Sequence, residues 1–312
     1  MIKYLKQADI DYDKWDTCID KAINSYVYAY SWYLDIVAGD WDALVEDDYE
    51  RVFPLPFRSK MGIKYIYQPI FSQQLGLFSK SLGSKEQLQD FLSAIPKSFK
   101  LIELNINKFH IPALADGAKI SENLNIELEL AKDYQSIAEN YSTNLKRNIK
   151  KAQKNGLQII PQIKPEELIN LFQKNKGTEI SAYSQEDYTR LGRLIYKLLD
   201  KGLAKIYSIG SAENNLLASA LFVKSNKRYI FLFSGLSDEG KQKSAMPFLI
   251  NQFIQDHSNS DFILDFEGSN DTNLARFYQS FGADKYSYYS YHKMDMPFWM
   301  KTPMHIYKKF RK

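Results

Sequence analysis

The chain has 312 residues, of which 45% are hydrophobic and 25% are charged, and its formal net charge at pH 7 is +4. This composition is typical of a folded soluble protein, and the length fits two domains of ordinary size. The mild positive charge argues against a dedicated nucleic-acid-binding protein but leaves room for one local basic patch. The single cysteine, Cys18, excludes an intrachain disulfide and a thiolate metal site, and the four histidines lack metal-ligand spacing.

The start of the chain and its apolar runs bear on location. Met1–Tyr4 begins a mixed polar segment rather than a signal peptide. No apolar run approaches the ~20 residues that a transmembrane helix needs. The sequence therefore predicts a cytoplasmic protein without a membrane span, without a metal and without a permanently bound cofactor.

Apolar spacing predicts two helices at the start of the chain, followed by three strands. The helices are Asp11–Ile23 and Tyr28–Val37, and the strands are Trp41–Glu46, Arg51–Phe57 and Ile63–Tyr67. Pro54 and Pro56 cannot donate ladder hydrogen bonds, so the second strand is expected at an edge or in an irregular form. Next come a polar-aromatic loop, Gln68–Phe78, a helix that begins at Ser84, and two strands, Leu101–Asn105 and Ile126–Leu130.

A strongly amphipathic helix is predicted over Asp133–Asn155, because its apolar residues recur at steps of three or four before Gly156. Its other face is basic and carries Lys146, Arg147, Lys150, Lys151 and Lys154. One interpretation is a solvated face whose cations are favoured near a helix C-terminus. The other is an anion site for substrate phosphates, anchored by Lys146 and Arg147.

The remaining elements follow an order similar to that of the first part, which indicates a repeated architecture. Predicted strands are Leu157–Ile163, Ala204–Ile209, Leu216–Val223, Tyr229–Phe233, Phe262–Phe266 and a last strand that reaches Tyr291. Predicted helices are Glu166–Lys174, Gln185–Leu199, Met246–Asp256 and Leu274–Phe281. Ser237–Ser244 is predicted as a polar loop, and the tail Met296–Lys312 as a helix between domains.

Four segments resemble those of known families. Asn144–Gly156, a basic helix ending in glycine, is similar to the start of the second domain of Fem-type peptidyltransferases, and Tyr28–Trp32 is similar to an early segment of their first domain. Leu264–Ser269 resembles the fifth strand of the GNAT N-acyltransferase fold, and Ala275–Gly282 resembles its fourth helix with the Tyr-x-x-x-Gly signature.

The resemblance implies an α/β (α+β) architecture of two tandem GNAT-like domains, which share the acyl-CoA N-acyltransferase fold. Each domain is expected to have a mixed, mostly antiparallel sheet flanked by helices. We expect an N-terminal domain over residues 1–132 and a C-terminal domain over residues 133–312. The second domain then includes the basic helix 133–155 and a C-terminal helix.

The activity that the resemblance implies is that of an N-acyltransferase or aminoacyltransferase. It would transfer an acyl group from acyl-CoA or aminoacyl-tRNA to an acceptor that bears an amine and can carry phosphate. In acetyl-CoA enzymes a loop after the fourth strand binds the pyrophosphate through backbone amides at a helix N-terminus. The loop here, Asp238–Ala245, lacks that pattern and carries two acidic residues. The alternative is therefore a non-catalytic binding module that has lost acyl-donor binding.

The predicted donor-binding residues follow from the same resemblance. Ser234 and Gly235 end the equivalent of the fourth strand, where a splayed strand would offer a backbone amide to the acyl oxygen. Gly240, Lys241 and Lys243 lie in the loop that would face the donor's phosphates.

Amine acylation needs a base for the amine, a site for the oxyanion and an acid for the leaving group. Tyr278 holds the position of the acid in the Tyr-x-x-x-Gly signature. Asp265 and Glu267 are two residues apart on a predicted strand and so share a face, and one of them can act as base through a water. The structural alternatives are a packed helix tyrosine and an N-cap network with Ser269 and Asn270.

Three glutamines lie in the first half, on the side where the resemblance places the acceptor. They are Gln68, Gln73 and Gln74. Their alternative role is to solvate the loop.

Overall fold

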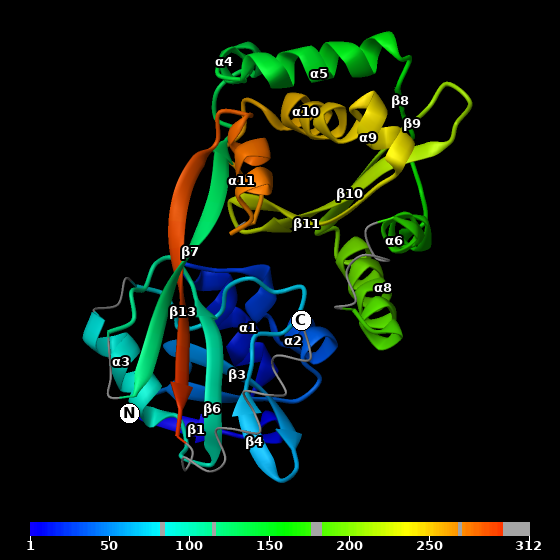
Figure 1. The fold of residues 1–312 in the computed structure, drawn as a ribbon. Coiled ribbons are helices and arrows are strands. Elements are labelled where there is room, and N and C mark those ends of the chain that lie inside the picture. Colours follow the sequence, from blue (N-terminus) through cyan, green and yellow to red (C-terminus); the bar gives the residue numbers. More distant parts are fainter. Residues whose placement is uncertain (82–84, 114–116, 176–182, 268–269, 296–312) are drawn as a thin grey trace. The chain divides into compact units, whose positions relative to one another are not determined.

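Hydrogen-bonded strands organise the chain into two units (Figure 1). The computed structural model describes residues 1–81, 85–113, 117–175, 183–267 and 270–295. The first unit comprises Met1–Asn123 and resumes at Ser287, and the second comprises Leu124–Tyr286. Two long strands, β7 (Ala118–Glu129) and β13 (Asp284–Met294), therefore have residues in both units. The predicted division at 132/133 assigns one continuous stretch to each domain and does not include this return of the chain to the first unit. The predicted tail helix lies outside the described residues.

The first unit has a sheet with the strand order β1-β2-β3-β4-β6-β13, and β5 pairs separately with β3. Its strands are β1 (Ile2–Leu5), β2 (Trp41–Glu46), β3 (Arg51–Lys60), β4 (Ile63–Ile66), β5 (Phe78–Ser79) and β6 (Phe99–Ile106). Its helices are α1 (Tyr12–Lys21), α2 (Ser31–Val37) and α3 (Lys85–Ala94), with 3-10 turns at Gln7–Asp9 and Val27–Ala29. Trp15 and Trp41 are fully buried with ring centroids 4.9 Å apart, so the core lies between α1 and β2.

Strand β3 accommodates its prolines through a gap in its pairing. It is not an edge strand, because β2 pairs with it along its first part and β4 and β5 pair on the other side. The recorded pairing on that other side covers Arg51–Val52 and Phe57–Lys60. Pro54 and Pro56 lie in the interval between these segments, where no ladder donor is needed.

The second unit has the strand order β7-β12-β11-β10-β9-β8, in which only β11 and β12 are parallel. Its own strands are β8 (Gln158–Ile159), β9 (Ala204–Gly210), β10 (Leu216–Ser225), β11 (Arg228–Leu236) and β12 (Ile263–Asp265). Its helices are α4 (Tyr134–Glu139), α5 (Thr143–Lys154), α6 (Pro165–Lys174), α8 (Gln185–Asp200), α9 (Asp238–Lys243), α10 (Ala245–His257) and α11 (Thr272–Gln279). This mixed, mostly antiparallel arrangement confirms the predicted fold class.

Helices cover both faces of this sheet (Figure 1). On one face Phe253 of α10 stacks on Phe222 of β10, with ring centroids 3.7 Å apart. On the other face Phe172 of α6 packs against Phe233 of β11, with ring centroids 4.7 Å apart. Ile149 of α5 joins the buried core on the α10 side, so α5 forms an outer layer whose opposite face remains exposed.

Several predicted elements are wrong in extent, including the following three. The single helix predicted over Asp133–Asn155 is two helices, α4 and α5, because Ser142 starts a new helix by accepting a hydrogen bond from the backbone N–H of Leu145. The strand predicted over Leu157–Ile163 is reduced to β8. The predicted loop Ser237–Ser244 contains α9, which Ser237 caps.

Gly240 of α9 provides a test of this packing. A Cβ at Gly240 would lie 2.4 Å from the backbone oxygen of Leu217 on β10. We expect Gly240→Ala to lower the free energy of unfolding by about 1–3 kcal/mol, because neighbouring backbone must move. The matched control is Gly192→Ala in α8, where the new Cβ meets only an Ile169 methyl at 3.8 Å. It should be neutral or stabilising by up to about 1 kcal/mol. Equal denaturation midpoints for the two variants would contradict this packing.

Candidate active site

The parallel strands β11 and β12 part within the second unit. Their recorded pairing runs from Arg228↔Ile263 to Ile230↔Asp265, and β11 then continues to Leu236. A bulge between β10 and β11 leaves Leu232 unmatched at the point where β11 departs, and bulges bend a strand. Ligands in open α/β sheets bind at the carboxyl ends of parallel strands. The divergence of β11 and β12 is therefore the natural place for a site.

Glu267 lies at this divergence in an unusual backbone conformation. Strand β12 ends at Asp265, and Glu267 has a φ of +55°. Its backbone N–H donates a hydrogen bond of 2.9 Å to Oδ1 of Asp265. The left-handed region is uncommon for residues other than glycine, and such outliers cluster at functional sites. The expectation that Asp265 and Glu267 share one strand face is wrong, because the strand has ended before Glu267.

Asp265 belongs to a buried ionic network. Arg228 Nη1 lies 2.8 Å from Asp265 Oδ2 and 3.1 Å from Glu127 Oε1, and the Asn125 amide donates to both acids at 3.1 Å. The exposed fractions of the Arg228, Glu127 and Asp265 side chains are 9%, 3% and 1%. Burial raises the pKa of Asp265, whereas the Arg228 guanidinium acts to lower it. Both oxygens of Asp265 are occupied, which favours Glu267 as the base.

Tyr278 is brought close to Glu267 by α11. Its ring is buried and stacks on Phe266 of the β12 segment, with centroids 4.7 Å apart. Burial, and then the negative charge of Glu267, raise the pKa of Tyr278 well above its ordinary value. The phenol is therefore neutral near pH 7 and carries a proton that it can donate. Asp271 caps α11, whereas Ser269 of the predicted cap network lies outside the described residues.

A second tyrosine beside Glu267 was not predicted from the sequence. Burial and the charge of Glu267 also raise the pKa of Tyr183. Its ring packs against Phe172 of α6 and Tyr188 of α8, with distances between ring centroids of 6.0 Å and 5.9 Å. Glu267 thus lies near two phenols that are 95 positions apart in the sequence. The only local signal was the spacing of Tyr183 and Tyr188 around a helix start, which does not indicate a site by itself.

Ser234 and Gly235 lie on the part of β11 that has left β12. A Cβ at Gly235 would lie 2.9 Å from the backbone N of Phe172, so this glycine allows α6 to approach the strand. Ser234 pairs with Ala220 on the β10 side and is partly exposed. The proposed backbone contact with an acyl oxygen stays a prediction.

The residues predicted to face a donor's phosphates are engaged within α9. Lys241 pairs with Asp238 at 2.9 Å, and Lys243 pairs with Glu239 at 2.7 Å. The Ser237 hydroxyl accepts from the N–H of Gly240 at 2.9 Å. The acids and the hydroxyl thus pair with groups that a pyrophosphate would contact, and donor binding at this segment stays a prediction.

The exposed face of α5 presents cations. Lys146 donates to the backbone oxygen of Glu139 at 2.8 Å, which ties it to the end of α4. Within the described part of the chain, no carboxylate pairs with the other cations of this face, Arg147, Lys150, Lys151 and Lys154, all of which are exposed. Beside them, between α5 and α11, lies a cavity of about 260 Å³ lined by residues that include Asn144, Asn148, Asn273, Arg276 and Phe277.

The three predicted glutamines shape one loop of the first unit. Gln68 donates to the backbone oxygen of Ser72 at 2.9 Å and accepts from the N–H of Asn105 at 3.0 Å. Gln74 is fully buried, donates to Gln73 at 2.6 Å and accepts from the N–H of Lys108 at 2.9 Å. These bonds give Gln68 and Gln74 a clear structural role, and acceptor binding stays a prediction.

Comparison with known proteins supports the fold. No protein-family model matches the chain, and no curated protein matches its sequence. The crystal structure of FemX is similar over 99% of this chain and 100% of its own, with a TM-score of 0.66 and 12% identity. The chain has a Fem-like fold. L-PGS from Bacillus licheniformis is similar over 95% of this chain and 96% of its own, with a TM-score of 0.56 and 11% identity.

A third structure is the C-terminal domain of a putative lysylphosphatidylglycerol synthetase from Agrobacterium fabrum. It is similar over 90% of this chain and 93% of its own, with a TM-score of 0.52 and 10% identity. The predicted resemblance to Fem-type proteins is thus confirmed at the level of the fold. Among the described residues, no helix has both the length and the apolar character needed to cross a bilayer.

Proposed function

We propose that the second unit transfers an acyl or aminoacyl group to an amine at the divergence of β11 and β12. The observation that supports this most is the position of Glu267, held past the end of β12 and electrostatically close to the phenols of Tyr278 and Tyr183. A partly exposed carboxylate near two neutral phenols, of which Tyr278 is buried, provides a base and an acid in one place. The Fem-like fold is consistent with this activity but does not by itself establish it.

In the proposed reaction, the ammonium of the acceptor loses a proton to Glu267, directly or through one water. The free amine attacks the carbonyl carbon of the donor and forms the new C–N bond. Backbone N–H groups on the open part of β11 stabilise the oxyanion. The bond from carbon to the leaving oxygen or sulfur then breaks, and Tyr278 supplies the proton to the leaving group. The nitrogen, which carries a positive charge after the attack, loses its second proton to the Tyr278 phenolate as the amide forms, and the acid formed at Glu267 releases its proton to solvent.

The donor that we favour is a charged tRNA rather than acyl-CoA. Segment α9 engages its own lysines and backbone and leaves no evident cradle for pyrophosphate. By contrast, α5 presents cations without carboxylate partners among the described residues, which suits the phosphates of an RNA. The adjacent cavity combines amides, Arg276 and the ring of Phe277, which suit the edges and faces of unpaired bases.

The test is a donor panel with one simple amine. Purified protein is mixed with Nα-acetyl-lysine and either acetyl-CoA or tRNA charged with radiolabelled glycine, alanine, serine or lysine. We expect label to appear in an amide of the acceptor with at least one charged tRNA and not with acetyl-CoA. Product formed with acetyl-CoA alone would overturn the choice of donor. Binding of none of the donors would favour the alternative, a binding module that has lost its donor, for which the occupied α9 segment is the supporting observation.

The basic face of α5 gives a separate prediction. We expect the triple variant Arg147→Gln, Lys150→Gln, Lys151→Gln to bind uncharged tRNA more weakly and to lower the slope of log K against log salt by about 2. The measurement is a filter-binding titration at several salt concentrations. A control triple variant, Lys6→Gln, Lys97→Gln, Lys119→Gln, removes the same charge from exposed positions of the first unit. An equal change of slope in both variants would show that the effect comes from net charge alone and that α5 is not the binding surface.

A further inference from the structure

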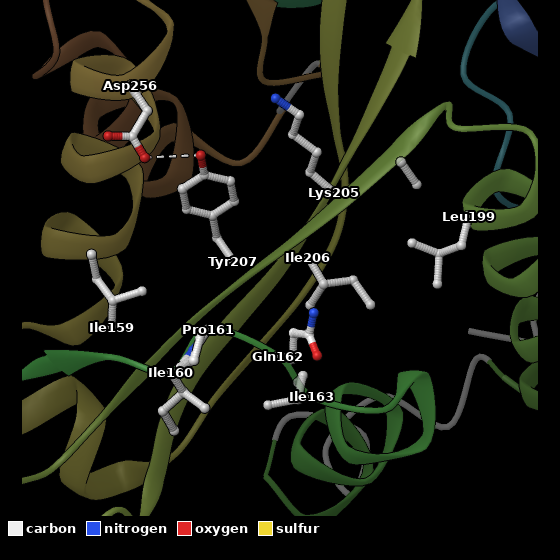
Figure 2. Close-up of a pocket in the computed structure, with 11 residues that line it drawn as sticks. Ile159, Ile160, Pro161, Gln162, Ile163, Leu199, Lys205, Ile206, Tyr207 and Asp256 are labelled. Carbon is white, nitrogen blue, oxygen red and sulfur yellow. Dashed lines mark hydrogen bonds between the residues drawn. The ribbon is translucent and has the colours of Figure 1, made fainter.

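The outer edge of the second unit contains a cavity that the proposed reaction does not use. It has a volume of about 580 Å³ and lies between the segment that leads from β8 to α6, the end of α8, and β9 (Figure 2). Its apolar wall includes Ile160, Ile163, Leu199 and Ile206. Cavities of this size with an apolar wall and a few polar groups are typical of ligand sites. None of the residues proposed for acyl transfer lines it.

The cavity exists because the pairing of β8 with β9 stops early. The ladder runs over Gln158↔Gly210 and Ile159↔Ile209, and Ile160 adds one hydrogen bond of 2.9 Å to the backbone oxygen of Ser208. The chain then passes through Pro161 and leaves for α6. Strand β9 begins at Ala204, so its first part has no described strand on that side. This is an open sheet edge within the wall of a cavity.

The backbone of Ile206 faces this open edge. The oxygen of Ser208 points outward, since it accepts from Ile160, whereas the oxygen of Leu203 points inward and accepts from Lys224 next to β10. Backbone groups alternate along a strand with a period of two, so the N–H and C=O of Ile206 point outward with those of Ser208. Among the described residues neither group has a hydrogen-bond partner. An edge of this kind is a template for another strand.

Side chains on the two faces of β9 differ in character. Ile206 faces Ile163 and Leu199, whereas Tyr207 lies on the side of α10 and donates to Asp256 Oδ2 at 2.9 Å (Figure 2). Lys205 Nζ lies 2.8 Å from Nε2 of His257.

His257 is neutral in this arrangement and therefore does not compensate the charge of Lys205. His257 Nδ1 lies 2.8 Å from the backbone oxygen of Phe253, which can only accept, so Nδ1 carries the proton and Nε2 accepts from Lys205. No carboxylate among the described residues pairs with Lys205. An exposed cation therefore flanks the open edge.

We propose that this edge binds an extended peptide as an added antiparallel strand, with an apolar side chain opposite Ile206 and an acidic side chain opposite Lys205. The antiparallel direction continues the ladder that β8 begins. The outward N–H and C=O of Ile206 exchange two hydrogen bonds with the apolar residue of the peptide. Its side chain enters the wall of Ile163 and Leu199. The neighbouring acid lies across from Lys205, where opposite charges stabilise a cross-strand pair.

The test uses a fluorescein-labelled peptide of alternating valine and glutamate, six residues long, and fluorescence anisotropy with the full chain. In the proposed register each valine directs its N–H toward β9 and each glutamate directs its N–H away. N-methylation of the central valine, residue 3 of the peptide, should weaken binding by about tenfold, because its hydrogen bond to the backbone oxygen of Ile206 is lost. N-methylation of the central glutamate, residue 4, is the matched control and should change the affinity by less than about threefold.

Two protein variants test the same register. Ile206→Pro removes only an outward N–H, which does not serve the β10 ladder, and should abolish binding with little loss of thermal stability. Lys205→Glu should weaken the glutamate peptide about tenfold and favour a lysine-valine peptide, whereas Lys154→Glu on α5, with the same change of charge, should do neither.

Equal affinity for the two N-methylated peptides would overturn the proposal, whether or not Ile206→Pro folds. The proposal would also be overturned if Lys205→Glu kept the wild-type preference for the glutamate peptide over the lysine peptide, or if the unmodified peptide did not bind. Failure of acyl transfer in the donor panel leaves these binding results unaffected, because the cavity and the proposed reaction share no residue.

Discussion

Replacing Arg228 with methionine should lower the free energy of unfolding by about 3–5 kcal/mol, because it leaves two buried carboxylates without their cation. Arg228 lies between Asp265 and Glu127, and all three side chains are at most 9% exposed. The measurement is chemical denaturation at constant salt. The matched control is Lys227→Met, one residue earlier, since Lys227 and its partner Asp261 are 72% and 82% exposed. Such surface pairs contribute about 0–1 kcal/mol.

The loss should be recoverable in two ways. Adding Asp265→Asn and Glu127→Gln to Arg228→Met removes the stranded charges and should restore a large part of the stability. Lower pH should act in the same direction. Burial already raises the pKa of Asp265, and loss of the guanidinium raises it further, so the folded state of the variant binds a proton that the unfolded state releases. The stability that this proton contributes is lost as the pH rises through the folded-state pKa of Asp265. The variant should therefore be more stable at about pH 5.5 than at about pH 8. A variant with wild-type stability at both pH values would show that the network is not buried as described.

Glu267→Gln should lower the turnover of acyl transfer by about 10²–10⁴-fold, provided that a donor is found in the panel. The amide keeps the size of the side chain but cannot accept the proton of the acceptor ammonium. Donor and acceptor affinities should change little, because the proposed role arises in the chemical step. Glu129→Gln, at the exposed end of β7, is the control for loss of one carboxylate from the same unit.

Tyr278→Phe tests the acid separately. It should lower turnover by much more than it lowers binding, and the loss should be smaller for donors whose leaving group needs less protonation. The variant removes one oxygen from a buried ring that stacks on Phe266, so thermal stability must be measured alongside. Equal losses of binding and turnover would remove Tyr278 from the acid role. Full activity in Glu267→Gln would show that Glu267 is not the base, and Tyr183 would be the next residue to test.

Much of the fold was predictable because local patterns specify local elements. Helices α1, α6, α8 and α10 follow apolar spacing, and β2 matches its predicted range. The errors occur where a local signal competes with a longer one. The cap at Ser142 divides a continuous apolar pattern into α4 and α5, and Ser237 caps a short helix in a segment without apolar periodicity.

The candidate site was predictable only in part for a related reason. Glu267 follows the end of β12, and Tyr278 lies on the next element, α11, so one local motif contains both. Tyr183 comes under the charge of Glu267 from a segment 84 positions earlier in the chain, and no periodicity connects the two residues. Likewise, Arg228 meets Glu127 across a separation of 101 residues.

The sequence by itself determined most of the helices and strands, the single cysteine, and the two acids and one tyrosine from which the base and acid would come. It left Asp265 and Glu267 equivalent, because residues two apart on a strand share a face. Only the tertiary structure separates them. Strand β12 ends between them, Arg228 and Asn125 occupy the oxygens of Asp265, and Glu267, which has a positive φ, lies near enough to two phenols for its charge to raise their pKa values. Burial and ion pairing depend on contacts between residues far apart in the chain, which a local pattern does not contain.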